Sequence, residues 1–183
     1  KYILKLSQNE LKEHRKKVAA LIFQNSVASL HPLLNIGDHF NAYLGGDNKT
    51  NKELAFAYFR EFGLGNANLI WHKYSYELSG GEATRVGILL ALLSMPKILS
   101  CDEITSGLAN ETKQKIINLL LSLDEKISII FITHDILSAM KIAQKVLIIE
   151  SGKQVAWGKF EDLASQNVLK KYLDAAKFYD AKL

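Results

Sequence analysis

Three short runs of apolar residues divide the chain, and segments with helical periodicity alternate with them. The runs occupy residues 18–23, 97–101 and 127–133. Because each run is continuous rather than alternating, it predicts a buried strand of a parallel sheet. Segments with an apolar helical face occupy residues 82–95, 111–123 and 135–145. Strands that alternate with helices predict an α/β fold with a largely parallel sheet.

The stretch between the first two runs is mostly helical in pattern. Residues 39–62 predict a helix that is interrupted near Gly45 and Gly46. Loops are predicted at residues 24–38 and 63–78. Pro96 is expected to end the helix before it, because the residue preceding a proline is pushed out of the α region. Residues 30–95 are therefore interpreted as an α-helical subdomain inserted into the α/β core.

The last part of the chain predicts a hairpin and two short helices. Residues 145–150 and 153–158 predict two strands joined by a turn at Ser151 and Gly152. The helices are expected from residue 159 onward. The predicted organisation has four parts: the start of the core with a glutamine loop (1–29), the helical subdomain (30–95), the rest of the core (96–158) and the C-terminal helices (159–183).

Composition and charge exclude several classes of protein. Of the 183 residues, 48% are hydrophobic and 23% are charged, which argues against a disordered or low-complexity chain. The net charge of +4 is modest and does not cluster on one motif, so we expect no nucleic-acid partner. The single cysteine, Cys101, excludes a disulfide framework and a cysteine-built metal site. Cys101 is interpreted as a small core residue.

The sequence LSGGE at residues 78–82, called here the signature segment, has the chemistry of an anion site. Ser79 is a good N-cap for the following helix, and Gly80 and Gly81 allow close approach to the backbone. The positive end of the helix dipole and its free N–H groups would suit a phosphate. An ordinary capped helix after a glycine turn is the alternative interpretation.

Polar residues also follow each of the three predicted strands. Asp102 and Glu103 follow the second strand, His134 follows the third, and Gln24 follows the first. Ligands of open α/β sheets bind at the carboxyl ends of the strands, which meet at one edge. A solvated acidic pair and polar loop residues are the alternative. The other histidines, His14, His31, His39 and His72, are interpreted as surface or loop residues.

Five features in a fixed order resemble the nucleotide-binding subunit of an ABC transporter, over nearly the whole chain. They are Gln24, LSGGE, the Asp102–Glu103 pair, SGLA at 106–109 and His134. The wording IFQNSVASLHPLLNIGD at residues 22–38 is similar to the peptide/nickel importer branch. This resemblance implies a P-loop NTPase-like (RecA-like) fold with an inserted helical subdomain. It also implies ATP hydrolysis with Mg²⁺ as cofactor.

The resemblance also implies a role for each site residue. Ser79, Gly80, Gly81 and Glu82 would meet the γ-phosphate of ATP held by the opposite subunit. Asp102 and Gln24 would hold Mg²⁺, Glu103 would polarise the attacking water, and His134 would contact the γ-phosphate. The implied partners are integral membrane permease subunits, a second ABC ATPase subunit and, indirectly, a solute-binding protein. The implied location is the cytoplasmic face of the membrane.

The chain departs from the family pattern at several positions. The phosphate loop GxxxxGK[ST] does not occur, and its nearest counterpart, Gly45–Thr50, has Asn48 before the lysine. Since the first residue is Lys1, we expect this motif upstream, in a chain truncated at its N-terminus, and no nucleotide binding by the 183 residues alone. Ala109 stands where the family carries the D-loop aspartate, and Glu82 stands where glutamine is commoner.

Two other functions stay open at this point. One is a catalytically inactive, truncated cassette that only dimerises or docks on a permease. The other is an ABC ATPase of DNA repair or translation, which would usually carry a coiled-coil insertion or paired cassettes. Neither of those features occurs in the sequence.

Overall fold

The computed structural model describes residues 3–123, 126–165, 169–170 and 172–174. The chain forms two compact units, Lys1–Ile132 and Thr133–Leu183. The predicted division into four parts stays a prediction.

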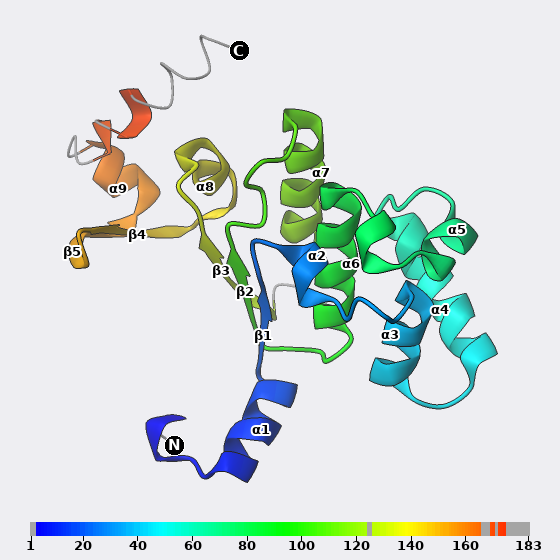
Figure 1. Ribbon diagram of the computed structural model, residues 1–183. Coiled ribbons are helices and arrows are strands. Elements are labelled where there is room, and N and C mark those ends of the chain that lie inside the picture. The colour runs from blue at the N-terminus through cyan, green and yellow to red at the C-terminus, as the bar shows by residue number, and fades with distance from the viewer. Residues whose placement is uncertain (1–2, 124–125, 166–168, 171, 175–183) are drawn as a thin grey trace. The chain divides into compact units, whose positions relative to one another are not determined.

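A parallel three-stranded sheet is the centre of the first unit (Figure 1). Its strands are β1 (Ala19–Ile22), β2 (Ile98–Asp102) and β3 (Ser128–Ile132), in the order β1-β2-β3. In the register Ile22 lies opposite Cys101, and Asp102 lies opposite Ile132. The structure therefore has all three predicted strands, each with its ends within a residue of those expected, and their carboxyl ends lie at one edge.

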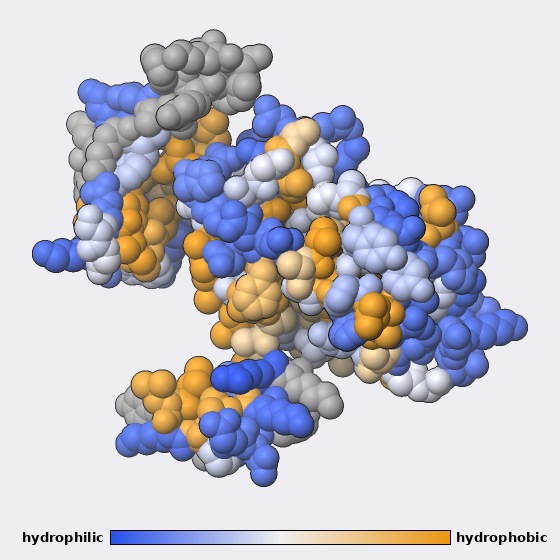
Figure 2. All heavy atoms as spheres, viewed as in Figure 1, coloured by the Kyte–Doolittle hydropathy of each residue, from blue (hydrophilic) through white to orange (hydrophobic). Residues whose placement is uncertain are grey.

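The prediction that all three strands are buried was wrong for β3 within the described residues. Leu99 and Cys101 of β2 are fully buried, whereas Ile130 and Ile132 of β3 are 52% and 48% exposed. Apolar residues accordingly reach the surface beside the sheet in Figure 2. A continuous apolar run shows that a strand is hydrophobic. The strand is buried on both sides only where another helix or strand packs on each face of the sheet.

Five α-helices and a 3₁₀ turn lie between β1 and β2. They are α2 (Ser26–Ser29), α3 (Ile36–Leu44), α4 (Asn48–Glu61), α5 (Ala67–His72), the turn η2 (Ser75–Glu77) and α6 (Gly80–Leu92). Gly45 and Gly46 separate α3 from α4, which confirms the predicted interruption. Their φ values of +65° and +74° are positive, a conformation that glycine adopts readily. Helices α2 and α5 fall in predicted loops. Asn25 and Asn66 cap them by accepting the amides of Ala28 and Leu69.

Aromatic rings form the core of α3, α4 and α5. The rings of Phe40 and Phe59 meet edge to face at 5.3 Å, and Trp71 lies 6.1 Å from both Phe40 and Phe56. Gly37 lies directly under Trp71, where a Cβ would overlap the indole ring.

His39 belongs to this core, so its interpretation as a surface or loop residue was wrong. It lies in α3 and is buried. Its Nε2 accepts the amide of His31 at 2.9 Å, and its Nδ1 lies 2.9 Å from the carbonyl oxygen of Asn35. Both ring nitrogens are therefore used to hold the loop that enters α3.

The remaining elements of the first unit are the turn η1 (Ile3–Lys5), α1 (Gln8–Lys17) and α7 (Asn110–Leu121). Helix α1 was not predicted, because its residues are polar on all sides. It begins at a capping box: the Ser7 amide donates to Glu10 Oε2 at 2.9 Å, and the Glu10 amide donates to Ser7 Oγ at 3.4 Å.

The second unit consists of α8 (Ile136–Ile142), the hairpin of β4 (Lys145–Glu150) and β5 (Lys153–Lys159), and α9 (Phe160–Ser165). The hairpin turns at Ser151 and Gly152, as predicted, and both residues have positive φ. Ile148, Leu163 and Leu169 form its buried core. Of the two predicted tail helices α9 is present, and the second lies largely outside the described residues. No helix in the described ranges is both long and apolar enough to cross a membrane.

Candidate functional site

The signature segment forms the capped beginning of α6. Ser79 has φ −65° and ψ 158°, the extended backbone of an N-cap. Its Oγ accepts the amide of Glu82 at 3.2 Å, and the Glu82 carboxylate accepts the amide of Ser79 at 2.7 Å. This reciprocal pair is a capping box, so the local sequence S-x-x-E fixes where α6 begins.

The first two amides of α6, those of Gly80 and Gly81, donate no hydrogen bond within the described part of the chain. Ser79 and Gly80 are exposed. Free N–H groups at the positive end of a 13-residue helix attract an anion.

The two glycines of the signature segment pack against the start of α7. A Cβ on Gly81 would overlap Cγ2 of Thr112, and one on Gly80 would lie 3.2 Å from Cδ2 of Leu108. Gly81 is buried, so its lack of a side chain serves helix packing as well as any approach of a ligand. Sequence reasoning found the glycines but missed Thr112, which carries no motif.

Glu82 has an ion-pair partner that the sequence did not predict. Lys73 Nζ lies 3.3 and 3.4 Å from the two carboxylate oxygens. Burial raises the pKa of Glu82, but hydrogen bonds from Ser79 and the ion pair with Lys73 outweigh it, so the pKa is lowered overall. Lys73 precedes Glu82 by nine residues, and it is the C-cap of α5, whereas Glu82 lies in α6. The spacing therefore gave no sign in the sequence that the two side chains form an ion pair.

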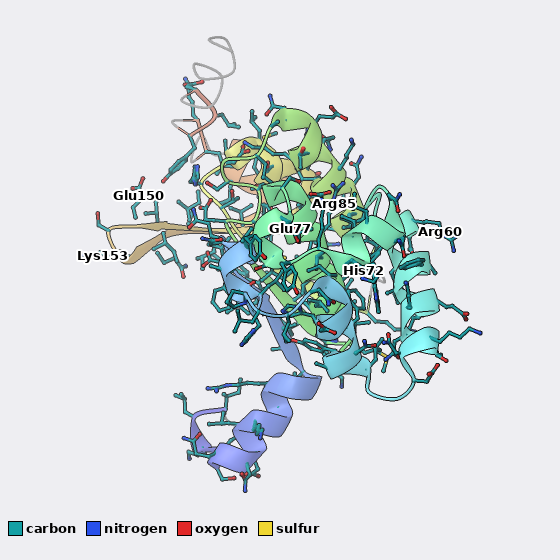
Figure 3. All side chains as sticks on the ribbon, turned by 45° about the vertical axis from the view of Figure 1, so that its right-hand side comes forward. Arg60, His72, Glu77, Arg85, Glu150 and Lys153 are labelled. Atoms are coloured by element: carbon teal, nitrogen blue, oxygen red, sulfur yellow. The ribbon has the colours of Figure 1, made fainter. Side chains whose placement is uncertain are left out.

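Arg85, labelled in Figure 3, follows Glu82 by three residues in α6. Its Nε donates to the carbonyl oxygen of Gly81 at 3.2 Å. Burial lowers the pKa of the guanidinium, and the nearby Glu82 charge partly offsets this effect. The group keeps its positive charge at neutral pH and supports the same first turn.

Three of the predicted site residues lie at the carboxyl edge of the sheet. Asp102 is the last residue of β2, Glu103 follows it, and Gln24 follows β1 two residues beyond Ile22. Gln24 is exposed, and Asp102 is half-buried. The parallel register confirms that these residues share an edge, as the strand pattern predicted.

The backbone at Glu103 is unusual. Its φ is +50°, a conformation that is uncommon for a residue with a side chain. The amide of Glu103 donates to the carbonyl oxygen of Ile132 at 2.9 Å, and its carbonyl oxygen accepts the amide of Ser106 at 2.9 Å. The carboxylate oxygen Oε2 is buried. Non-glycine residues at positive φ concentrate at functional sites, because surrounding contacts must hold them there.

Hydrogen bonds and close packing join the glutamine loop to α6. Ser26 Oγ donates to the Phe23 carbonyl oxygen at 3.2 Å and lies 3.5 Å from Thr84 Oγ1. The Thr84 hydroxyl donates to the Gly80 carbonyl oxygen at 2.9 Å. Helices α2 and α6 pack together, and α6 also packs on β1. The loop and the signature helix are therefore neighbours although 58 residues separate Ser26 from Thr84.

The segment 106–109 leads into α7. Gly107 has φ +71°, and Ala109 is the N-cap with φ −61° and ψ 148°. The Ala109 carbonyl oxygen accepts the amide of Lys113 at 2.9 Å, but its side chain offers no acceptor for the first turn. The missing D-loop aspartate is thus also a missing helix cap.

His134 belongs to the second unit. It is exposed and follows Thr133. Asp135 caps α8 by accepting the amides of Leu137 and Ser138 at 3.1 and 3.2 Å. Asp135, next to His134, therefore fixes where α8 begins. The predicted contact of His134 with the γ-phosphate stays a prediction.

The predicted site residues form two groups in the first unit. The signature segment packs on Leu108 and Thr112, and Gln24, Asp102 and Glu103 lie at the carboxyl edge. In the described ranges, no three His, Cys, Asp or Glu side chains are placed to hold a metal ion together. A metal at the carboxyl edge would need oxygen ligands from elsewhere, such as nucleotide phosphates and water.

The sequence pattern of the ABC transporter family matches residues 3–106, which is more than half of the chain. The chain belongs to the ABC transporter family. The fold agrees, since a dimeric bacterial ABC transporter cassette, MJ0796, superimposes with a TM-score of 0.73 and 25% identity. That match covers 84% of this chain and 68% of the cassette. The predicted P-loop NTPase-like fold and the resemblance to ABC nucleotide-binding subunits are confirmed.

Curated relatives include ATP-binding proteins of peptide and methionine import. The oligopeptide transport ATP-binding protein AmiE of Streptococcus pneumoniae is 34% identical over 163 residues, which are 86% of this chain and 46% of that protein. The methionine import ATP-binding protein MetN of Staphylococcus haemolyticus is 37% identical over 162 residues, again 86% of this chain and 46% of that protein. The chain spans about half the length of these relatives.

Proposed function

We propose that this chain is part of an ATP-binding and ATP-hydrolysing subunit that powers solute uptake through a membrane permease. The observation that carries the proposal is the beginning of α6, where a capped helix of an ABC family member presents the amides of Gly80 and Gly81. Peptide is the favoured solute class because the relatives include a peptide-import protein, and nickel is the alternative within the same branch.

The signature segment would bind the γ-phosphate of ATP that a second subunit holds. Ser79 offers a hydroxyl beside the two amides, and the helix dipole favours the negative charge. A solved relative, MJ0796, is a dimer bound to ADP and phosphate, which supports this arrangement. The phosphate loop of each site would come from sequence outside these 183 residues.

The carboxyl edge would provide the hydrolytic groups. Asp102 and Gln24 offer oxygen ligands of the kind that Mg²⁺ prefers, and the ion would offset phosphate charge. Glu103 would accept a hydrogen bond from the attacking water and orient it, and His134 would contact the γ-phosphate. These parts contribute by positioning and charge stabilisation, since the reaction requires no covalent intermediate with the protein.

The proposed partners follow from this activity. A second ATPase subunit would complete each ATP site. Integral membrane permease subunits would bind the ATPase at the cytoplasmic face of the membrane and change conformation when the ATPase dimer closes and reopens. A solute-binding protein would deliver the solute to the permease. No nucleic-acid partner is proposed, because the net charge of +4 is modest and does not cluster on one motif.

The test is ATP hydrolysis by the intact protein with its permease in proteoliposomes, with peptide or nickel supplied. We expect turnover that Glu103→Gln lowers by at least about 10²-fold while ATP still binds. Glu111→Gln, which removes a charge from the exposed face of α7, is the control. The 183-residue chain alone should bind no ATP, and micromolar affinity in a titration would contradict this.

A second candidate is a non-catalytic docking module, favoured by the lack of GxxxxGK[ST] in these residues and by Ala109. Stable binding of the intact protein to the permease without any ATP hydrolysis would establish this alternative and refute the enzyme.

A further inference from the structure

We propose that Lys73 is a positioning residue of the signature segment. Its ammonium neutralises Glu82, so that the beginning of α6 can accept the phosphate of ATP. This inference rests on the proposed function and adds a residue to it.

The geometry of the pair is that of a partly buried ion pair at a helix end. Lys73 Nζ lies 3.3 and 3.4 Å from the two oxygens of Glu82, and the side chains are only 20% and 24% exposed. The same carboxylate accepts the amide of Ser79 at 2.7 Å. The negative charge is therefore fixed in the first turn of α6, beside the amides of Gly80 and Gly81.

A fixed carboxylate at this position opposes anion binding. It consumes one amide of the helix end and repels a phosphate that approaches the remaining two. A paired ammonium removes the net charge, which makes the pair electrically similar to the glutamine that is commoner at this position. Pairs that are largely shielded from water are also screened less by salt than exposed ones.

The backbone holds Lys73 where this role requires it. Lys73 ends α5, its amide donates to the carbonyl oxygen of Ile70 at 3.2 Å, and its carbonyl oxygen accepts the amide of Ile36 at 2.9 Å. Tyr74, the next residue, forms a β-bridge with Asn35. The backbone of Lys73 is thus anchored by α3 and α5, independently of α6.

Other charged groups near the pair do not replace it. Arg85 interacts with Glu82 electrostatically, but its Nε is bonded to the Gly81 carbonyl oxygen. Glu77, on the turn before α6, adds a negative charge and accepts the amide of Tyr74 at 2.7 Å. Lys73 is accordingly the cation that contacts both oxygens of Glu82.

The test is a double-mutant cycle on the intact protein, with ATP-dependent dimerisation and ATP affinity as readouts. We expect Lys73→Met to weaken ATP affinity about 3- to 10-fold at low salt, with a smaller effect at 0.5 M NaCl, since the penalty is electrostatic. In the Glu82→Gln background the same substitution should change affinity less than about twofold, because no carboxylate is left to neutralise. Lys49→Met, which removes the same charge from α4, is the control.

Each outcome decides the proposal. An equal loss of affinity in both backgrounds, or a loss that salt does not reduce, would overturn the neutralising role and indicate a structural one. No loss in either background would also overturn it. Lys73→Arg, which keeps the charge, should retain affinity even if Lys73→Met folds poorly, and failure of that variant to bind counts against the proposal. If the unmodified protein binds no ATP, the proposed function itself is refuted. If the unmodified protein binds ATP but the Lys73 variants behave otherwise than expected, only the role of Lys73 is refuted.

Discussion

Gly81 lies so close to Thr112 that a methyl group on its Cα would overlap Cγ2 of the threonine. The first turn of α6 and the first turn of α7 are therefore in direct contact. This contact joins the proposed anion-binding end of α6 to the segment that follows the acidic pair Asp102–Glu103. The glycine cannot be replaced without moving one of the two helices or the threonine side chain.

Gly81→Ala is expected to lower the free energy of unfolding by about 1–3 kcal/mol, because overpacking forces neighbouring groups out of their preferred positions. Thr112→Ala in the same chain should recover most of this loss, since it removes the overlapping methyl group. Urea denaturation measures both values.

Gly80→Ala is the matched control, because its Cβ would meet only the flexible end of Leu108 at 3.2 Å. Its effect on stability should be clearly smaller. If the two alanine variants were equally stable, the packing role of Gly81 would be refuted.

Ala109→Asp is expected to raise the free energy of unfolding by about 0.5–2 kcal/mol, because aspartate accepts an amide of the first turn and alanine does not. The N-cap backbone is already extended, so the new side chain needs no rearrangement. Ala109→Asn, which caps without a charge, should give a similar gain. A loss of stability in both variants would show that Ala109 is not the working cap of α7.

Glu82 should make the protein sensitive to acid. Its pKa is lowered in the folded state, so its contribution to stability is fully present above the ordinary glutamate pKa of 4.5 and is lost as the pH falls below it. Unfolding free energies from pH 7 to pH 3 should therefore fall more steeply for the unmodified protein than for Glu82→Gln. Glu53→Gln, on the exposed face of α4, controls for the loss of one charge. Parallel curves for the protein and Glu82→Gln would contradict the ion pair.

Cys101 should report the opening of the sheet. It is fully buried in β2, and burial raises the pKa of its thiol to about 12. Because the thiolate is the reactive form, we expect no reaction with a disulfide reagent in the native protein and full reaction in urea. Cys101 is the one cysteine of the sequence, so the signal belongs to β2 alone. Fast labelling without denaturant would show that β2 opens locally.

The sequence predicted the strands and the capped beginning of α6 because both depend on local sequence. Runs such as residues 18–23 mark a strand by hydropathy, and Gly45 with Gly46 marks a break between helices. The signature segment carries its own capping box, so its place at a helix start could be predicted from five residues. Asp102 and Gln24 reach one edge simply because their strands are parallel.

What the sequence missed depends on packing between distant segments. Helices α2 and α5 are too short for a periodic signal and are defined by asparagine caps. Lys73 and Thr112 gain their roles from the helices they meet, and His39 is buried only because the loop before α3 folds over it. Partial coverage of β3 could not be predicted either, since hydropathy does not identify what packs on a strand.

A long hydrogen bond of 3.5 Å from the Ser26 hydroxyl to Thr84 Oγ1 connects two distant motifs, the glutamine loop and α6. A partner that displaces residues 24–30 must either carry α6 with it or break this bond and the packing of Gly87 against Ile22 and Ser26. We therefore expect a displacement of the glutamine loop to be passed to α6 through side-chain contacts, without passing along the backbone between them.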